Sequence, residues 1–345
     1  MIPTDSKGKA KMDELTVCFP IIRQDMILDA IRSLRECTKN HTFKVVVVNQ
    51  TVPNREFEDA LYDLSDIVIR PHSNYGFSQA SNLAMRLAPT PYICVCNDDV
   101  VFLPTEPDWF TGCLETFERF ETAAAVNPMS PKEPGWGWGE PDHRYLIPEV
   151  YMTSNIKSLY DEDRKRMQIV RSLKLEYEQV RTQEVLDKWR AAEKEFMVTQ
   201  DELHDLVFGL SHDPEFVKAL VKEKNWMVID AFACWCTVFR TDRLVEVGMF
   251  DEAWTPGGGE DYDEMARIYQ KSYRALSTSR AWCWHRWGLS KGSPDGFNTA
   301  LPLARPNWNK MSEEGFGVDG AWSYNCDVWG KDCVRVDPII YRAPL

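Results

Sequence analysis

The sequence lacks the long apolar run that a membrane-spanning helix needs, which is about 20 residues. Its longest apolar run with the character of a buried element, Ala231 to Phe239, is only as long as a strand. The opening stretch, MIPTDSKGKAKMDEL, is polar and contains no signal-peptide core. We therefore expect no transmembrane segment and a soluble, cytoplasmic protein.

Basic charge is also scarce. The chain has 40 Lys and Arg against 53 Asp and Glu, which gives a formal net charge of −13. A protein that coats nucleic acid through its overall charge needs a surplus of cations, so the composition disfavours that class. A local basic groove is still compatible with these counts.

The cysteines lack the C-x-x-C spacing of a zinc site. Among ten cysteines, Cys94 and Cys96 lie in one apolar run and Cys234 and Cys236 in another. Residues i and i+2 of a strand share a face, so each pair is expected to point into one core. Buried, reduced thiols of this kind are typical of a reducing compartment.

What is present is the pattern of an α/β protein. Of 345 residues, 44% are hydrophobic and 27% charged, which excludes wholesale disorder. Strand and helix patterns alternate over the first 130 residues and predict a mostly parallel sheet with helices on both faces. A loop rich in Pro, Gly and Trp and a charged helical segment interrupt this pattern before it resumes. The predicted units are 13–130, an insertion at 131–227, 228–292 and an irregular extension at 293–345.

The individual elements follow from hydrophobic periodicity. Helices are expected over residues 25–36, 57–64, 78–87, 242–247 and 262–271, with two or three more within 158–224. Strands are expected over residues 15–20, 44–48, 67–69, 92–96, 229–239 and 275–277. In parallel sheets ligands bind at the carboxyl ends of strands, so the loops after Val48 and Cys96 are the first candidates for a site.

Two adjacent carboxylates stand where the strand ending at Cys96 stops, in the triplet Asn97-Asp98-Asp99. Such a pair is costly unless a cation lies nearby. Mg²⁺ or Mn²⁺ takes oxygen ligands and keeps positions open for a diphosphate. The alternative is a solvated turn, since Asn and Asp are common turn residues.

A second acidic group follows a glycine run. Gly257 to Gly259 precede Glu260-Asp261-Tyr262-Asp263-Glu264. Asp261 and Glu264 have the spacing of a capping box, but a carboxylate at a helix start could equally act as a general base. His285 lies among aromatic residues, where it is either a packed side chain or a further metal ligand.

These motifs occur together in a recognisable order. They are VVVVNQT at 45–51, NYGFSQASN at 74–82, YICVCNDDV at 92–100, GMFDE at 248–252, EDYD at 260–263 and HRWGLS at 285–290. This series resembles the family 2 inverting glycosyltransferases, and within them the rhamnosyltransferase-like branch. The resemblance covers residues 13–130 and 228–292. It implies the GT-A fold, a Rossmann-like mixed sheet with helices on both faces, here with a helical insertion.

The resemblance also implies roles for single residues. Asp99 and His285 would hold a divalent cation, Mn²⁺ or Mg²⁺. Asp261 would be the general base, with Glu260 orienting it or the acceptor. Residues 13–130 would bind the nucleotide-sugar and 228–292 the acceptor. The nucleotide-sugar-binding residues would be Pro20, Asn49, Asn74, Gly76, Phe77, Asn82, Asn97 and Asp98.

Two positions depart from the family pattern. The family usually has an acid where Asn49 stands. An amide can accept a hydrogen bond from a pyrimidine imide, but it also offers a donor, so the choice of nucleobase stays open. The metal-binding triplet begins with Asn97 in place of Asp, which leaves more of the metal binding to Asp99 and His285.

The predicted activity is therefore that of a metal-dependent inverting hexosyl- or pentosyltransferase. It would move a sugar from a nucleoside-diphosphate sugar to an acceptor hydroxyl, expected to belong to a glycan. Trp136 and Trp138 are candidates for stacking on the acceptor, or else anchor the insertion. The helical segment 158–224 is either a lid over the acceptor, a dimer contact or a packing element.

Three alternatives remain at this point. The acceptor could be a hydroxymethylated DNA base, which the net charge disfavours but a groove with Lys132, Arg144 and Arg286 would permit. The chain could be a catalytically inactive module that binds nucleotide or glycan. It could also be a metal-independent relative.

Overall fold

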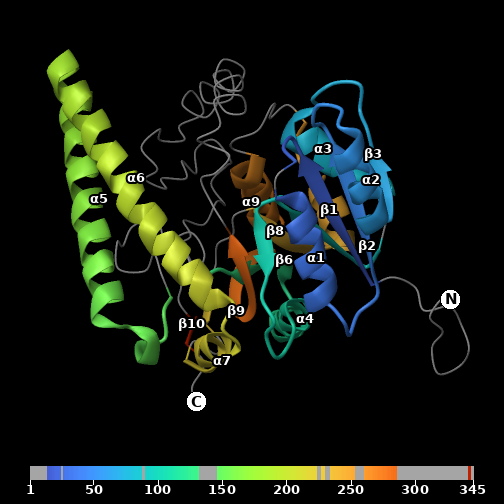
Figure 1. Cartoon of the computed structure of the whole chain (residues 1–345). Helices are drawn as coiled ribbons and strands as arrows, with labels where there is room; N and C mark the ends of the chain where they lie inside the picture. Colours follow the sequence, from blue (N-terminus) through green and yellow to red (C-terminus); the bar gives the residue numbers. More distant parts are fainter. Residues whose placement is uncertain are drawn as a thin grey trace, which may run out of the picture.

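The computed structural model describes most of the chain outside its two ends. The described residues are 14–24, 26–87, 90–131, 146–223, 227–229, 234–252, 260–285 and 341–342. Figure 1 shows an α/β body and, beside it, two long helices that extend away from it. Within the described residues no helix is both long enough and apolar enough to cross a membrane.

The α/β body is built on a single mixed sheet. Its strands are β1 (Leu15–Ile21), β2 (Phe43–Asn49), β3 (Ile67–Ile69), β4 (Tyr92–Cys96), β5 (Val100–Phe102), β6 (Ala123–Met129), β7 (Met227–Ile229), β8 (Cys236–Arg240), β9 (Arg274–His285) and β10 (Tyr341–Arg342). Their order is β10-β7-β9-β6-β8-β4-β1-β2-β3, with β5 paired to β9. The predicted mixed sheet with helices on both faces is confirmed.

The expectation that the sheet is mostly parallel holds for only half of it. β1 pairs in parallel with β2 and β4, and β2 with β3. β8, however, lies antiparallel between β4 and β6. The segment predicted as one strand over 229–239 is in fact two, because β7 ends at Ile229 and β8 begins at Cys236. The strand expected at 275–277 is much longer and runs to His285.

Helices cover both faces of the sheet. They are α1 (Ile27–Cys37), α2 (Arg55–Leu64), α3 (Gly76–Leu87), α4 (Trp109–Arg119), α8 (Thr241–Val247) and α9 (Glu260–Gln270). The alternation along β2 shows how one strand serves two cores. Val45 and Val47 pack with α1 and α2, whereas Val46 and Val48 pack with α3. This is the period-two pattern expected of a strand buried on both faces.

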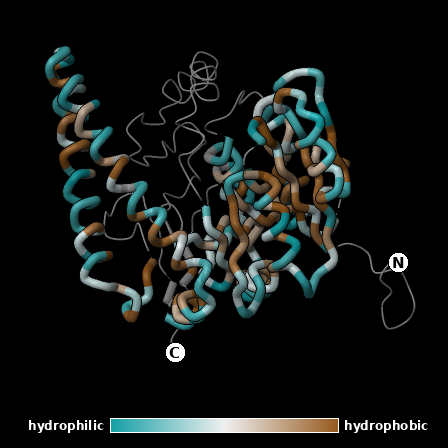
Figure 2. Tube along the Cα trace, in the orientation of Figure 1, coloured by the Kyte–Doolittle hydropathy of each residue, from teal (hydrophilic) through white to brown (hydrophobic). Residues whose placement is uncertain are grey.

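In the part of the insertion that the structure describes, residues 146–223, there are three α-helices, α5 (Ser154–Val180), α6 (Gln183–Ser211) and α7 (Pro214–Glu223). Figure 2 shows that α5 and α6 are predominantly hydrophilic at the end distant from the body. At the near end, apolar residues of α6 and α7 such as Val207 and Phe216 pack with Trp282 and Trp284 of β9. The insertion is thus anchored on the strand that ends at His285.

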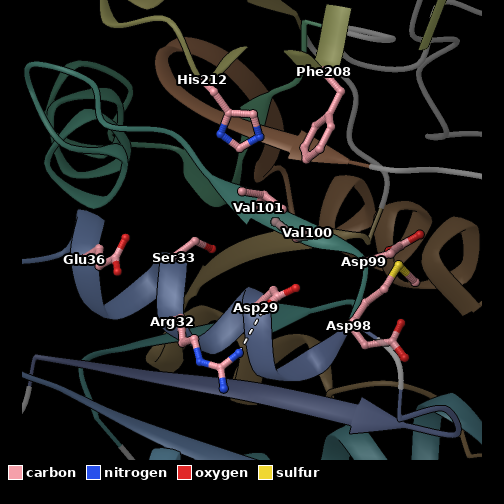
Figure 3. A pocket seen from close by; sticks show the side chains of 11 residues that line it. Asp29, Arg32, Ser33, Glu36, Asp98, Asp99, Val100, Val101, Phe208 and His212 are labelled. Atoms are coloured by element: carbon pink, nitrogen blue, oxygen red, sulfur yellow. Dashed lines mark hydrogen bonds and ion pairs between the residues drawn. The ribbon is translucent and has the colours of Figure 1, made fainter. Parts of the chain in front are cut away.

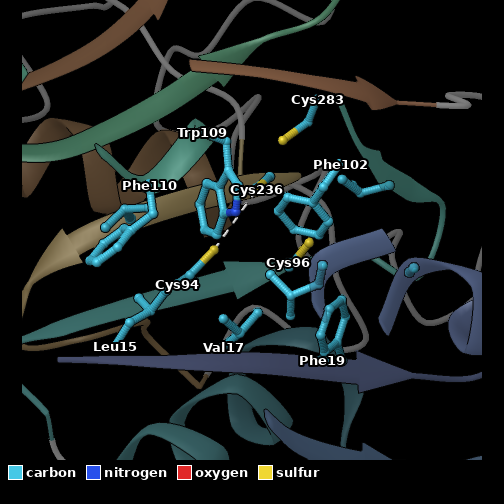
Figure 4. Close-up of a cluster of buried hydrophobic side chains, with 14 of the residues drawn as sticks. Leu15, Val17, Phe19, Cys94, Cys96, Phe102, Trp109, Phe110, Cys236 and Cys283 are labelled. Carbon is cyan, nitrogen blue, oxygen red and sulfur yellow. Dashed lines mark hydrogen bonds between the residues drawn. The ribbon is translucent and has the colours of Figure 1, made fainter. Parts of the chain in front are cut away.

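The thiols form part of the core, as predicted for buried, reduced cysteines. The eight described cysteines are all free, and all of them except Cys37 are buried. Cys94, Cys96, Cys236 and Cys283 share one core, and the sulfurs of Cys94 and Cys236 lie 3.8 Å apart (Figure 4). Cys234 was expected on the same face as Cys236, but it precedes β8 and packs into the opposite core.

Candidate active site

The centre of the candidate site is a contact between Asp99 and His285. Asp99 follows β4, and the next residue, Val100, lies directly opposite His285 in the β5–β9 pair. This register brings Asp99 Oδ1 to 3.3 Å from His285 Nε2, and both residues are buried. The two residues predicted as metal ligands are therefore brought together by the pairing of two strands distant in sequence.

The imidazole of His285 is held by its surroundings. Its ring stacks on Trp235, with the centroids 4.9 Å apart and the planes 8° from parallel. The backbone N–H of His285 donates to Ser130 Oγ over 3.3 Å. The carbonyl of Trp235 accepts from the N–H of Asn97 at 2.8 Å, which ties the indole to the end of β4.

The electrostatics favour an ionised Asp99. Burial raises the pKa of this carboxyl, but His285 and the guanidinium of Arg23 outweigh it and hold the pKa below its ordinary value. Arg23, two residues beyond the end of β1, is half-buried and was not singled out from the sequence. The sequence feature that would have pointed to Arg23 is a basic residue just after β1, the strand that pairs with β4.

The Asp99–His285 pair fits a divalent cation. Asp99 Oδ1 is buried and makes no hydrogen bond within the described part of the chain, although His285 lies beside it. A carboxylate oxygen and an imidazole nitrogen both suit Mn²⁺. No set of three or more His, Cys, Asp or Glu side chains among the described residues is arranged to hold a metal. Two protein ligands leave positions for a diphosphate and water.

The acidic turn of α9 lies close to the loop that carries Trp235. Burial raises the pKa of the Cys234 thiol, and the nearby carboxylates of Asp261, Glu260 and Glu264 raise it further. Since Cys234 adjoins Trp235, the first turn of α9 and the Asp99–His285 pair border the same loop. Asp261 is half-buried at this turn. Met265 and Ile268 of α9 pack in the same core as Cys234, whereas Val100 and Phe102 of β5 belong to a different core.

The capping-box interpretation of Asp261 and Glu264 is wrong. Glu264 is fully buried, and its Oε2 accepts from Arg267 Nη2 at 2.6 Å. Arg267 also binds Asp263 and the carbonyl of Val247, so it fixes α9 against the end of α8. Burial raises the pKa of Glu264 to about 8, with Arg267 opposing that shift. The carboxylates of Asp263 and Glu264 therefore help to hold α9, the helix that carries Asp261, in place.

At the other end of the site, Asn49 closes β2. It is 1% exposed, and its Oδ1 accepts from both the N–H and the hydroxyl of Thr51. Its Nδ2 makes no hydrogen bond within the described residues. The amide carbonyl is thus already engaged, and the free capacity of Asn49 is that of a donor. Pro20 lies half-buried near the end of the neighbouring strand β1.

The NYGFSQASN segment forms the start of α3. Asn74 is exposed and its Oδ1 accepts from the N–H of Gly76, which has a positive φ of 75°. Asn82 is buried and clamps a distant segment, since its amide bonds both the N–H and the carbonyl of Phe250. Phe77 packs edge-on against Phe250. The predicted roles of these residues toward nucleotide stay predictions.

Several predicted residues lie outside the described part of the chain. They are the acceptor candidates Trp136 and Trp138, the basic residues Lys132, Arg144 and Arg286, the run Gly257 to Gly259, and all of 293–345 except 341–342. The roles that the sequence suggests for them stay hypotheses.

A pocket of about 240 Å³ opens beside the Asp99–His285 pair. Figure 3 shows Asp98 and Asp99 at one end, with Phe208 of α6 and His212, the residue after α6, on the opposite side from α1. None of the α1 or α6 residues that line it was singled out from the sequence. Their signal is not a motif, because they come from two segments that only the tertiary fold brings together.

Comparison with known proteins supports the predicted class. Residues 17–174 match the model of glycosyl transferase family 2. The match covers a little under half of the chain and includes Asn49 and Asp99, and it agrees with the predicted class of enzyme. No curated protein matches the chain.

Three solved structures are similar to the chain at low sequence identity. The first is the mannosyltransferase PcManGT from Pyrobaculum calidifontis in complex with GDP-Man and Mn²⁺, with 13% identity and a TM-score of 0.46 over 88% of this chain and 64% of that one. GalNAc-T7 with UDP, GalNAc and Mn²⁺ shows 10% identity and a TM-score of 0.48 over 81% and 44%. Staphylococcus aureus TarS shows 12% and 0.43 over 85% and 39%. The chain thus spans 39% to 64% of the length of these proteins.

Proposed function

We propose that the chain is a metal-dependent, inverting glycosyltransferase that uses a nucleoside-diphosphate sugar. The observation that carries this proposal is the buried contact between Asp99 and His285, which borders the same loop as the acidic turn of α9. The family match over residues 17–174 supports the class of reaction. The acceptor is proposed to be a hydroxyl of a glycan.

Asp99 and His285 would hold the divalent cation. When bound, such a cation neutralises the negative charge that develops on the departing diphosphate. Arg23 is a second positive group near Asp99 and would attract the same anion. The stacked Trp235 would keep the imidazole of His285 in the orientation seen in the structure.

Asp261 would be the general base. As the acceptor oxygen attacks the anomeric carbon, its proton moves to the Asp261 carboxylate, and the bond from the anomeric carbon to the diphosphate oxygen breaks. One displacement from the face opposite the leaving group inverts the anomeric centre. Alignment of the two substrates lowers much of the remaining barrier. Glu260, on the same turn, would orient the base or the acceptor.

Thermal-shift measurement tests the proposal. UDP, dTDP, GDP, CDP and ADP are added with and without Mn²⁺, and a ligand at 100 times its Kd stabilises the fold by about 2.7 kcal/mol. We expect one nucleotide to raise Tm only when Mn²⁺ is present. Asp99→Asn and His285→Gln should remove the Mn²⁺-dependent part, whereas Asp242→Asn, whose side chain is 77% exposed outside the site, should not.

Two results would count against the proposal. A nucleotide that shifts Tm equally without metal would indicate a metal-independent relative. A panel without any shift would indicate that the chain does not use a nucleotide-sugar, and binding of glycan or DNA would then be the next measurement.

A further inference from the structure

A side-chain clamp joins α3 to the segment that follows α8, residues 248–252. Asn82, in the middle of α3, is 1% exposed, and its Oδ1 accepts from the N–H of Phe250 at 3.2 Å. Its Nδ2 donates to the carbonyl of Phe250 at 2.8 Å and to Glu252 Oε1 at 3.0 Å. Because a backbone N–H only donates and a carbonyl only accepts, these contacts fix which amide atom is the oxygen.

The clamp uses the donor capacity of Asn82 completely. A side-chain amide has two N–H donors and one carbonyl oxygen. The donors serve Phe250 and Glu252, and the oxygen holds the N–H of Phe250. No donor is left for an oxygen of a diphosphate or a ribose, and the side chain is buried. Asn82 therefore suits a contact with nucleotide poorly, although the motif to which it belongs predicts one.

The backbone of the clamped segment has an unusual conformation. Gly248 and Met249 have positive φ angles of 109° and 61°, so the chain passes twice through the left-handed region directly after α8. In a residue other than glycine, this conformation persists only where the surrounding contacts enforce it. Phe250 is the next residue, and its N–H and carbonyl are the groups that Asn82 binds. The clamp therefore fixes the chain where it leaves this turn.

The same stretch of chain is joined to α9. Arg267 of α9 donates to the carbonyl of Val247, the last residue of α8, over 2.9 Å. The ring of Phe250 packs in one core with two apolar residues of α9, Met265 and Ile268. The position of α9 therefore depends on a segment that α3 holds. Asp261 lies on the first turn of α9, so a shift of this segment would displace the proposed base.

We propose that Asn82 is a positioning residue for Asp261. Its clamp on Phe250 and Glu252 sets the place of α9, and Asn82 itself makes no contact with the nucleotide. This inference rests on the proposed function and adds to it a residue that controls the geometry of proton transfer. A misplacement of about 1 Å far from the chemistry can cost about 10²-fold in rate, so a clamp of this kind matters for turnover.

Asn82→Asp tests the clamp. Asp has the size of Asn and still accepts from the N–H of Phe250, but it cannot donate to the carbonyl of Phe250, and its charge opposes that of Glu252. Hydrogen–deuterium exchange by mass spectrometry compares α9 with α1, which packs in the core on the other face of the sheet. We expect exchange in α9 to accelerate by about tenfold more than in α1. Equal acceleration in both helices, or none in α9, overturns the inference.

A second substitution tests whether the effect passes through Glu252. In the double variant Asn82→Asp, Glu252→Gln, the Gln amide can donate to the new carboxylate, so exchange in α9 should slow again. No recovery would contradict the clamp. If Asn82→Asp does not fold, Glu252→Ala replaces it, because this side chain is 37% exposed and its loss breaks only one bond of the clamp. Exchange in α9 should then accelerate by about threefold relative to α1, and an unchanged α9 overturns the inference.

Thr38→Val is the matched control. Thr38 is 2% exposed, and its Oγ1 accepts from Trp109 Nε1 at 2.7 Å, so the variant loses a buried side-chain hydrogen bond beside the core that contains α1. It should lower Tm without accelerating exchange in α9 more than in α1. If Thr38→Val changes α9 as Asn82→Asp does, exchange in α9 reports stability alone and the inference is wrong.

Nucleotide binding distinguishes a positioning residue from a ligand-binding one. The Kd of the diphosphate that raises Tm in the thermal-shift panel is measured with Mn²⁺ in Asn82→Asp and in the unmodified protein. We expect the two Kd values to agree within about twofold, and release of that diphosphate from its nucleotide-sugar to slow by about tenfold or more.

Two further results separate this inference from the proposed function. A Kd weakened about tenfold at normal exchange in α9 would make Asn82 a nucleotide contact, which overturns the inference while the proposed function stands. Absence of nucleotide binding in the unmodified protein overturns both.

Discussion

The indole of Trp235 lies almost parallel to the imidazole of His285, 4.9 Å away between ring centroids. Trp235 precedes β8 and His285 ends β9, so the stack joins two strands that are not neighbours in the sheet. It fixes the ring whose Nε2 faces Asp99. The proposed metal pair therefore depends on a residue that binds no metal itself.

Trp235→Leu should weaken Mn²⁺ binding in the presence of nucleotide. Groups that orient a metal-bound histidine typically change metal affinity by about 10- to 100-fold, and we expect the lower end because a stack orients less strictly than a hydrogen bond. Titration of Mn²⁺ by electron paramagnetic resonance measures it. Trp189→Leu on α6 serves as control, and equal affinity in both variants would show that the stack is dispensable.

Asp261→Asn should abolish glycosyl transfer and leave nucleotide binding near normal. The amide keeps the size of the side chain but cannot take the proton of the acceptor. The rate should fall by about 10²-fold or more. Release of nucleoside diphosphate measures transfer, and the thermal shift measures binding. Turnover at the normal rate would mean that the base lies elsewhere, with Glu260 the next candidate.

Two helical glycines should respond in opposite directions to alanine. A Cβ atom at Gly112 of α4 would collide with the backbone carbonyl of Arg280 in β9, whereas one at Gly209 of α6 meets no atom within 4 Å. Gly112→Ala should destabilise the fold by about 1–3 kcal/mol. Gly209→Ala should stabilise it by up to about 1 kcal/mol. Urea unfolding measures both, and a neutral Gly112→Ala would contradict the close α4–β9 packing.

Glu264 should make the stability depend on pH. Its pKa is about 8 in the folded protein against an ordinary 4.5, because burial disfavours the charge. Between these values the folded state keeps a proton that the unfolded chain releases, so stability falls as pH rises through this window. Above pH 8 both states are ionised and the loss is complete.

Glu264→Gln removes this dependence. The variant should exceed the unmodified protein in stability by on the order of 5 kcal/mol at pH 9, and the difference should vanish near pH 4.5. Urea unfolding at several pH values measures it. A variant that is less stable at pH 9 would show that the ion pair with Arg267 outweighs the cost of burial.

Much of the fold could be predicted from local patterns. The β-branched run Val45 to Val48 and the helical spacing in α1 are properties of short segments, so β2 and α1 were placed within two residues. The same patterns failed over 227–240. An apolar run does not show whether it forms one strand or two. Here it contributes to both β7 and β8, which lie at different positions in the sheet.

The candidate site, like the fold, could be predicted only in part. Local patterns in the sequence were enough to place residues at strand ends and helix starts, and the order of the motifs pointed to Asp99, Asp261 and His285. Three relationships are visible only in the folded chain: Val100 pairs opposite His285, Trp235 stacks on that imidazole, and Phe208 faces α1 across a pocket. The physical reason is that strand register and helix packing depend on burial summed over the whole chain, which no short segment contains.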